Sequence, residues 1–306
     1  MTKPMTRLMA TLFAMAITVS IISGCGKSNA GLNESQGQTD SNSSHADQKQ
    51  SNSTPTTATT DQSDLDLNPN SDTSNASDND LPDEAPKTDN NETVIEKSYH
   101  MNKVYFIKPN DDEGNKKVVL LTFDDGPKEE EMLTSILDTL DKHQAKAIFF
   151  VNGFRVKAKP ELLKLIDKRG QIIGNHSYDH INLKKESNEK IDQQLSDVQT
   201  IVQDTIGKTP QFFRPPHGAG NDYLRAKVKE LGMLYMTWSN GSLDWADNQH
   251  KPDGVIKSVM DQLAPGSNIL MHELPWTAEA LDTLLTKIEQ AGYTFVDPRA
   301  IELEAR

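Results

Sequence analysis

The feature that most restricts the fold of this chain is an alternation of short apolar runs with longer amphipathic stretches, which begins at Val118. Short apolar runs are typical of buried strands, and stretches with apolar residues at helical spacing are typical of helices that cover a sheet. The predicted strands are 118–123, 147–151, 171–175, 211–213, 234–238, 268–272 and 293–296, and the predicted helices are 130–143, 160–169, 189–206, 222–231, 254–263 and 277–291. Strands that alternate with helices pair in parallel, so the fold class is α/β, and about seven strands form either a doubly wound sheet or a (β/α) barrel.

Polar residues at the ends of the strands favour the barrel. Clusters of them follow the first, third, fourth and fifth strands, at residues 122–126, 175–180, 214–218 and 239–245, and His272 ends the sixth. A barrel gathers the carboxyl ends of all its strands on one rim, whereas an open sheet concentrates its site at one switch point. Five strands that deliver polar groups therefore predict a barrel with its site on the carboxyl-terminal face.

The amino-terminal 25 residues have the pattern of an export signal. Basic residues precede an apolar run at 8–22, which is too short for a committed membrane span. The sequence Ile22-Ser23-Gly24-Cys25 resembles a bacterial lipobox, and Cys25 is the only cysteine in the chain, which excludes an internal disulfide. The alternative is a cleaved signal with an incidental cysteine. We expect a lipidated Cys25, whose acyl chains would anchor an extracytoplasmic lipoprotein to the cell membrane.

Residues 26–98 form a segment rich in Ser, Asn, Asp, Thr and Gln, with few apolar side chains. Such a composition cannot bury enough surface to offset the entropy of ordering, so we predict a disordered linker between the anchor and a folded domain at 99–306. The linker has 4 lysines and 14 acidic residues, and therefore carries most of the formal net charge of −13. An acidic chain argues against nucleic acid as a partner. A plain solubilising spacer explains this segment at least as well as any binding role.

Taken one at a time, the polar clusters are ambiguous. Asp124-Asp125-Gly126 has the composition of an ordinary turn. His176 and His180 are four residues apart, so on a helical turn both rings would face one metal ion, although such a pair also arises by chance. Together on one rim, two imidazoles and a carboxylate make a three-ligand metal site with room for water and a substrate oxygen. A second carboxylate can then act as base and a further histidine as acid, which are the groups that amide hydrolysis requires.

With these motifs in order, residues 118–298 resemble the carbohydrate esterase family-four polysaccharide deacetylases. The five matching motifs are Thr122-Phe123-Asp124-Asp125-Gly126-Pro127, His176-Ser177-Tyr178-Asp179-His180, Arg214-Pro215-Pro216-His217-Gly218, Ser242-Leu243-Asp244-Trp245 and Ile269-Leu270-Met271-His272. The resemblance implies a distorted (β/α) barrel that hydrolyses N-acetyl groups of amino sugars in a metal-dependent reaction.

The resemblance also implies how the first motifs act. Asp125, His176 and His180 would hold one divalent ion, with Zn²⁺ the first choice and Co²⁺ or another first-row metal an alternative. Asp124 would be the general base, and Arg214 would pair with it and keep it ionised.

The later motifs would supply the acid and the substrate contacts. His272 would be the general acid, with Asp244 available to orient it or stabilise its charge. The backbone N–H of His217 would stabilise the oxyanion. The residues that would contact the substrate and its acetyl methyl group are Pro216, His217, Trp245 and Leu270.

Two positions depart from the family pattern. His217 stands where the family usually has Tyr, and because the expected role is a backbone one, catalysis should survive the change. Gly241 stands where many members have the first Asp of the fourth motif, a residue thought to tune the acid histidine. Some branches that deacetylate muramic acid also lack that Asp, so the change bears on substrate more than on activity.

The substrate expected is a cell-wall polysaccharide, with peptidoglycan N-acetylglucosamine or N-acetylmuramic acid preferred over chitin oligomers. The rival from another class is a catalytically weak glycan-binding lipoprotein, and a third interpretation is a metal amidohydrolase for a small molecule or peptide. We expect a monomer. Residues 103–115 leave open a short strand or an extra hairpin ahead of the barrel.

Overall fold

The computed structural model of the chain describes residues 95–247 and 250–306. The expected export signal, Cys25 and all but the last residues of the expected linker lie outside the described residues. Within the described part, no helix is both long enough and apolar enough to cross a membrane.

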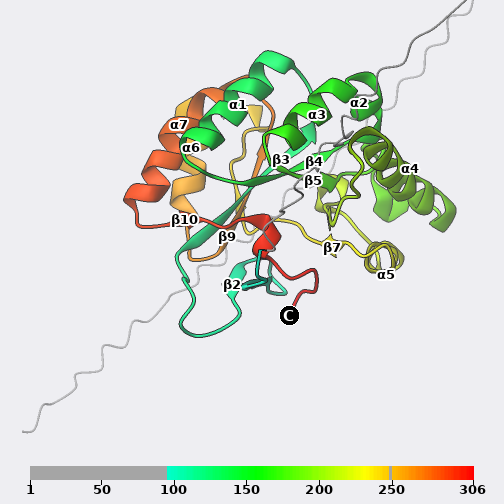
Figure 1. Cartoon of the computed structure of the whole chain (residues 1–306), viewed down its shortest axis with the longest axis horizontal. Helices are drawn as coiled ribbons and strands as arrows, with labels where there is room; N and C mark the ends of the chain where they lie inside the picture. Colours follow the sequence, from blue (N-terminus) through cyan, green and yellow to red (C-terminus); the bar gives the residue numbers. More distant parts are fainter. Residues whose placement is uncertain (1–94, 248–249) are drawn as a thin grey trace, which may run out of the picture. The chain divides into compact units, whose positions relative to one another are not determined.

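A curved parallel sheet forms the centre of the folded part (Figure 1). Its strands are β3 (Val118–Gly126), β4 (Ala147–Val151), β5 (Ile172–Asn175), β6 (Phe212–Phe213), β7 (Leu234–Tyr235), β8 (Asn240–Gly241), β9 (Ser267–His272) and β10 (Thr294–Phe295). Seven of them follow the order β7-β6-β5-β4-β3-β9-β8, and β10 pairs with the first residues of β3. The seven parallel strands curl into a half-barrel, which confirms the predicted distorted (β/α) barrel.

Helices cover the outer face of this sheet. They are α1 (Glu130–Lys142), α2 (Gly153–Ala158), α3 (Pro160–Lys168), α4 (Asn188–Ile206), α5 (Asp222–Glu230), α6 (Pro252–Asp261) and α7 (Pro275–Gln290). Neighbouring helices contact each other in the order α6, α7, α1, α3, α4, α5, which follows the order of the strands beneath them. Proline opens α3, α6 and α7, where its missing N–H costs nothing, and the Ser187 hydroxyl accepts from Lys190 N at the start of α4.

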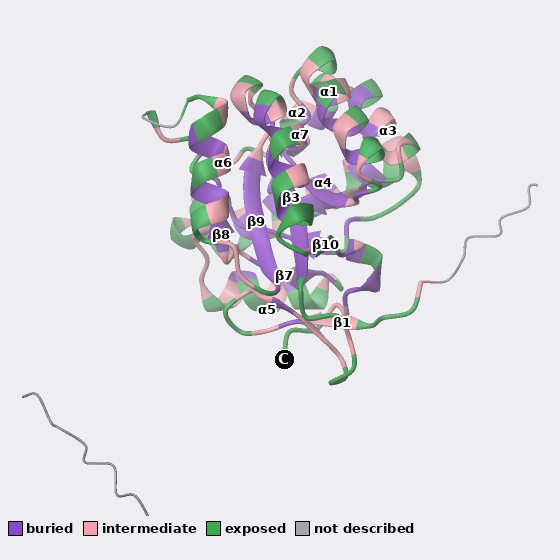
Figure 2. Ribbon diagram, turned by 90° about the vertical axis from the view of Figure 1, so that its left-hand side faces the viewer, coloured by how far each residue is buried: buried purple, intermediate pink, exposed green. Residues whose placement is uncertain are grey.

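The alternation of side chains along β3 divides the core into two apolar layers. Val119, Leu121 and Phe123 pack beneath the helices, and the Phe123 ring stacks on Phe149 with centroids 5.0 Å apart. Val118 and Leu120 belong to a separate cluster on the inner side of the half-barrel. β3 and β9 are almost wholly buried (Figure 2).

The side chains of β3 that face the inside of the half-barrel change from apolar to polar along the strand. Thr122 and Asp124 follow Leu120 at the same two-residue spacing, and both are buried. The inner side of the half-barrel is thus apolar near the amino ends of the strands and polar near their carboxyl ends, which locates the site.

A short hairpin lies at the apolar end of the half-barrel. β1 (Tyr99–Met101) and β2 (Ile107–Pro109) pair in antiparallel fashion, and Met101 and Ile107 join the inner apolar cluster. Ile107 N donates to Gly266 O at 2.8 Å. A Cβ on Gly266 would lie 2.0 Å from Ile107 O, so only glycine allows this approach. The sequence left open whether residues 103–115 contain a short strand or an extra hairpin ahead of the barrel. The structure has the hairpin, with β2 as its second strand.

Candidate active site

Two consecutive carboxylates leave β3 towards the same site. In a regular strand Asp124 and Asp125 would point to opposite faces of the sheet. The register with β4 shifts between Asp124 and Gly126, and Asp125 has a left-handed backbone with φ of 67°. This bulge turns the second carboxylate, so that Oδ2 of Asp124 and Oδ1 of Asp125 lie 3.7 and 3.4 Å from Nε2 of His176.

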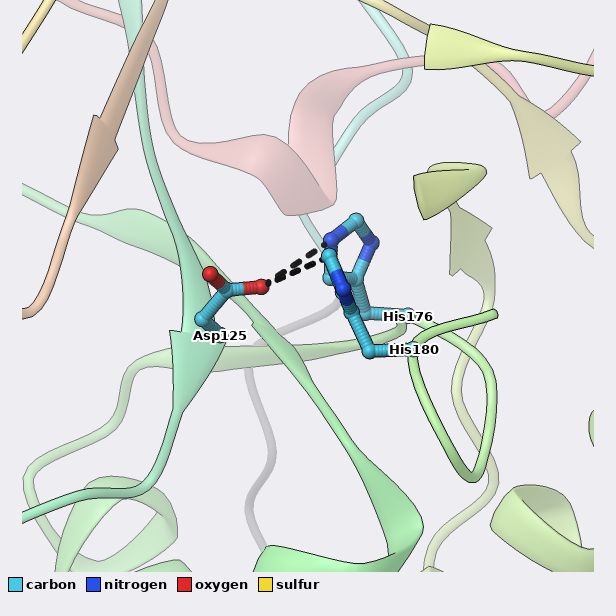
Figure 3. A group of neighbouring side chains, drawn as sticks. All are labelled: Asp125, His176 and His180. Carbon is cyan, nitrogen blue, oxygen red and sulfur yellow. Dashed lines mark ion pairs between the residues drawn. The ribbon is translucent and has the colours of Figure 1, made fainter. Parts of the chain in front are cut away.

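The two histidines of the second motif lie together, but not on a helical turn. Residues 176–180 form an irregular loop after β5, with φ of 64° at Ser177 and 56° at His180, so the expected helical geometry is wrong. The left-handed residues fold the loop back on itself and bring the two ring centroids within 5.1 Å. Both rings point at Asp125, whose Oδ1 is 3.1 Å from Nε2 of His180 (Figure 3).

The convergence of Asp125, His176 and His180 fits a divalent metal ion. Their ligand atoms lie within 4.8 Å of one another, and the buried Oδ1 of Asp125 has no hydrogen-bond donor among the described residues. Burial alone would raise the pKa of Asp125, but the interactions with His176 and His180 hold that pKa well below its ordinary range. Two imidazoles and one carboxylate are the ligands of many open zinc sites, and several first-row metals accept them.

A backbone contact fixes which nitrogen of His176 faces the site. Its Nδ1 lies 2.7 Å from the carbonyl oxygen of Arg214, which can only accept, so Nδ1 carries the hydrogen. Nε2 is therefore left with its lone pair directed towards Asp125.

Arg214 lies inside the half-barrel and pairs with Asp124. Its side chain is fully buried, and Nη1 donates to Oδ1 of Asp124 and to the Thr122 hydroxyl, each at 2.7 Å. The guanidinium also lies 4.4 Å from the centroid of the Phe150 ring. Because an unpaired buried charge is costly, each member of this pair requires the other. The contact occupies Oδ1 of Asp124 and leaves Oδ2 on the side of His176.

His272 is held by Asp244, which is fully buried. His272 Nδ1 lies 2.7 Å from Oδ1 of Asp244, and Oδ2 accepts from His272 N at 2.8 Å and from the Thr277 hydroxyl at 2.7 Å. Burial lowers the pKa of His272, but the hydrogen bond and charge of Asp244 outweigh it and raise that pKa above the ordinary value. With Nδ1 engaged, Nε2 is the nitrogen that can serve a substrate.

The expected substrate-contacting residues lie on the same rim. The partly exposed Trp245 meets His272 edge to face, with ring centroids 5.3 Å apart. Leu270 is buried two residues before His272 on β9. Pro216 is buried, and the His217 ring lies 4.9 Å from that of His180, on a backbone with φ of 59°. The structure therefore brings the metal-ligand, base and acid candidates together, with His217 in contact with His180 and Trp245 in contact with His272.

Comparison with known proteins supports the same assignment. Residues 111–236 match the family model described as polysaccharide deacetylase. The chain is 35% identical to the peptidoglycan-N-acetylmuramic acid deacetylase PdaA of Bacillus subtilis over 196 residues, which cover 62% of this chain and 74% of PdaA. The chain belongs to the polysaccharide deacetylase family.

Other polysaccharide deacetylases match over different shares of their length. The peptidoglycan-N-acetylmuramic acid deacetylase PdaC of Bacillus subtilis is 35% identical over 222 residues, which cover 69% of this chain but only 46% of PdaC. The chain thus spans less than half the length of that relative.

Two solved structures are similar in fold. The Bc1960 peptidoglycan N-acetylglucosamine deacetylase is 32% identical, with a TM-score of 0.58 over 62% of this chain and 91% of that one. BA3943 of Bacillus anthracis, described as a pseudoenzyme of the same family, is 33% identical, with a TM-score of 0.58 over 61% of this chain and 67% of that one.

The two departures from the polysaccharide deacetylase pattern have local explanations. At Gly241, an added Cβ would meet Trp245 and Trp238 at ordinary contact distances of 3.6 and 3.7 Å, so the position has room for a side chain. Asp244 holds His272 without any help from that position. At His217 the ring lies against that of His180.

Sequence reasoning missed several residues around this site. Thr277 anchors Asp244, and the buried Glu273 accepts from Lys128 N at 2.9 Å. Lys128 and Arg155 lie beside Glu273, close enough to affect its ionisation. The only sequence signal for them is proximity to a motif, since Glu273 directly follows His272 and Lys128 follows Pro127.

Proposed function

We propose that this protein removes N-acetyl groups from amino sugars of peptidoglycan, at N-acetylglucosamine or N-acetylmuramic acid, and releases acetate. The observation that carries the proposal is the meeting of a paired carboxylate, Asp124, and a paired imidazole, His272, beside one metal-ligand triad. Membership of the polysaccharide deacetylase family and the names of its relatives support the substrate class.

The proton transfers follow from the two pairs. Asp124 takes a proton from the attacking water through Oδ2, while Arg214 holds Oδ1 and keeps the carboxylate oriented. His272, held by Asp244, gives a proton to the departing amine, without which the C–N bond does not break readily. The backbone N–H of His217 stabilises the oxyanion.

Asp125, His176 and His180 would hold the metal ion. A divalent cation bound there supplies a Lewis acid for the acetyl carbonyl and lowers the pKa of water. Zn²⁺ is our first assignment, and Co²⁺ and other first-row ions remain compatible with the ligand set, since availability decides among them.

The substrate is tested by acetate release from peptidoglycan strands and from chitin oligomers of matched length. Faster release from peptidoglycan is expected. Equal or faster release from chitin oligomers would contradict the cell-wall assignment.

The likeness to the pseudoenzyme BA3943 favours one rival, a glycan-binding lipoprotein with weak catalysis. Acetate release distinguishes the two functions. A deacetylase and a glycan-binding protein should both bind glycan strands, but only the deacetylase should release acetate. Saturable binding without acetate release by the metal-loaded protein would establish the rival.

We also propose that the protein is extracytoplasmic and monomeric, and that it is anchored through a lipid on Cys25 with residues 26–98 as the linker. The support is the lipobox pattern and the composition of the linker. Cys25→Ser should move the protein from the membrane fraction to the soluble fraction, because the lipid provides the attachment. A Cys25→Ser protein that is processed and still sediments with membranes would refute the lipid anchor.

A further inference from the structure

Two cationic side chains, Lys128 and Arg155, have no assigned role. Lys128 is close enough to Asp125 to interact with its charge, and both cations lie near Glu273. Lys128 lies three residues after Asp125, and Arg155 lies on α2. The start of α2 is tied to both ligand-bearing loops, since Asn152 N donates to Gly126 O at 3.0 Å and Gly153 N donates to Ser177 O at 3.3 Å. The backbone around these two cations is thus fixed relative to the site.

Neither cation has an anionic partner among residues 95–247 and 250–306. No salt bridge within 4.0 Å involves Lys128 Nζ or the Arg155 guanidinium, and Nε of Arg155 is buried without an acceptor. Their neighbour Lys159 differs, because its Nζ lies 2.9 Å from a carboxylate oxygen of Glu129. The Lys128 side chain is half-buried, and this burial lowers the pKa of its ammonium. Partly desolvated cations without counter-ions are costly, and binding of an anion would offset that cost.

The nearest acidic groups do not neutralise the pair. Asp125 is directed at His176 and His180. Glu273 is buried, and its Oε1 has no hydrogen-bond donor. Burial raises the pKa of Glu273 to about 7, so near neutral pH its carboxyl group is only partly ionised. Asp244, which also acts on Lys128, has both oxygens engaged by His272 and Thr277. None of these carboxyl groups forms an ion pair with Lys128 or Arg155.

We propose that Lys128 and Arg155 bind a carboxylate carried by the glycan beside the N-acetyl group that is removed. This inference rests on the proposed function and narrows its substrate. In N-acetylmuramic acid, the lactyl ether at C3 is adjacent to the acetamido group at C2, so its carboxylate must lie close to whatever holds the acetyl group. N-acetylglucosamine has only a hydroxyl there. Charge-assisted hydrogen bonds from lysine and arginine are the usual means of recognising a carboxylate.

The carboxylate has two sources in peptidoglycan. In peptide-free strands it is the lactyl group itself, whereas in peptide-bearing strands that group is in an amide bond and the free carboxylates belong to the peptide. Both sources present a free carboxylate to Lys128 and Arg155. Peptide-free and peptide-bearing substrates distinguish the two sources.

The test compares kcat/KM of the metal-loaded full chain on a peptide-free oligosaccharide that contains N-acetylmuramic acid and on its lactyl methyl ester. The parent should prefer the free acid by about 10-fold or more, the usual scale of a charge-assisted contact. Lys128→Met and Arg155→Met should each reduce that preference several-fold, mainly through KM. Because acid and ester are measured on the same variant, a partial folding defect cancels in the ratio.

Lys157→Met is the matched control, since Lys157 is an exposed lysine on the same helix as Arg155 and should leave the acid-to-ester ratio unchanged. Calorimetric titration of the same two oligosaccharides provides a readout independent of turnover. The parent should bind the acid more tightly than the ester, and the two Met variants should not.

The outcomes are distinct. One outcome is that the parent prefers free over esterified carboxylates only on peptide-bearing strands. If the two Met variants lose that preference, the inference stands, with the peptide as the source of the carboxylate. Equal rates and affinities of the parent for free and esterified carboxylates, on peptide-free and on peptide-bearing strands alike, would overturn it. Acetate release from chitin oligomers in that case would leave deacetylation standing, whereas no acetate from any substrate would refute the proposed function itself.

Discussion

Asp244 makes three contacts with its two oxygens, and two of them are to His272. The His272 side chain acts as an acid only while it is protonated, so activity falls as pH rises through its pKa. Asp244 raises that pKa, and Asp244→Asn should therefore move the alkaline limb of the kcat/KM profile to lower pH, with a larger loss of rate in alkaline than in mildly acidic buffer. The pH profile of acetate release measures this shift. An unmoved alkaline limb would mean that another group supplies the proton.

Glu273 should make the stability of the protein depend on pH. Its pKa is raised from 4.5 to about 7 in the folded state. As pH rises from about 4.5 to about 7, the unfolded chain releases this proton while the folded chain keeps it, so the folded state loses up to about 3 kcal/mol.

Glu273→Gln keeps the shape of the side chain but cannot ionise. The free energy of unfolding of this variant, from urea titrations at pH 5 and pH 8, should fall less between the two values than that of the parent. The same fall in both proteins would show that Glu273 ionises normally.

The end of β3 depends on close packing between two strands. A Cβ on Gly126 would lie 1.9 Å from Oε1 of Glu273, whose carboxyl group is buried and held by Lys128 N. Gly126→Ala should therefore lower the free energy of unfolding by about 1–3 kcal/mol, the range of overpacked sites. Gly241→Ala, at the end of β8, is the matched control, since its Cβ would make only ordinary contacts and should cost less than about 1 kcal/mol. Equal stabilities of the two variants in urea titrations would contradict the packing at β3.

Most elements could be predicted because their signals are long and periodic. The structure has the predicted strands and helices within a few residues at each end, from β3 to β10. It also contains β8, with 2 residues, and α2, with 6, which are too short to show a period. The hairpin of β1 and β2 depends on contacts with Gly266, which is distant in sequence, so no local pattern determines it.

The motif residues could be predicted, but not the backbone that makes them converge. The bulge at Asp125 and the left-handed residues Ser177 and His180 are conformations that residue type alone does not reveal. The spacing of His176 and His180 predicted a helical turn, and this prediction is wrong. The left-handed residues of the loop bring the two rings together without a helix. Glu273 and Lys128 escaped notice because their importance lies in burial and missing partners, which only the three-dimensional structure shows.

At the scale of the whole molecule, the half-barrel separates stability from chemistry along its strands. Its apolar end is filled by the inner cluster and the hairpin, and its polar end gathers residues from β3 and β9 and from the loops after β5, β6 and β8. The residues proposed for the chemistry therefore lie at the opposite end of the strands from the hairpin, and the two groups meet where Arg214 contacts Phe150. Substitutions in the triad should change metal content or rate with little effect on folding.

Acetate release from peptidoglycan strands by the full chain, measured with zinc content on the same samples, tests the central claim most directly. The zinc-loaded parent should release acetate, chelation should abolish the release, and returned Zn²⁺ should restore it. Asp125→Asn should lose both zinc and rate, whereas Asp124→Asn should keep its zinc and lose about 10²–10⁴-fold in rate, because the amide can still accept from Arg214 but cannot act as a base. Acetate release that survives exhaustive chelation, or an Asp124→Asn protein as fast as its parent, would contradict the account.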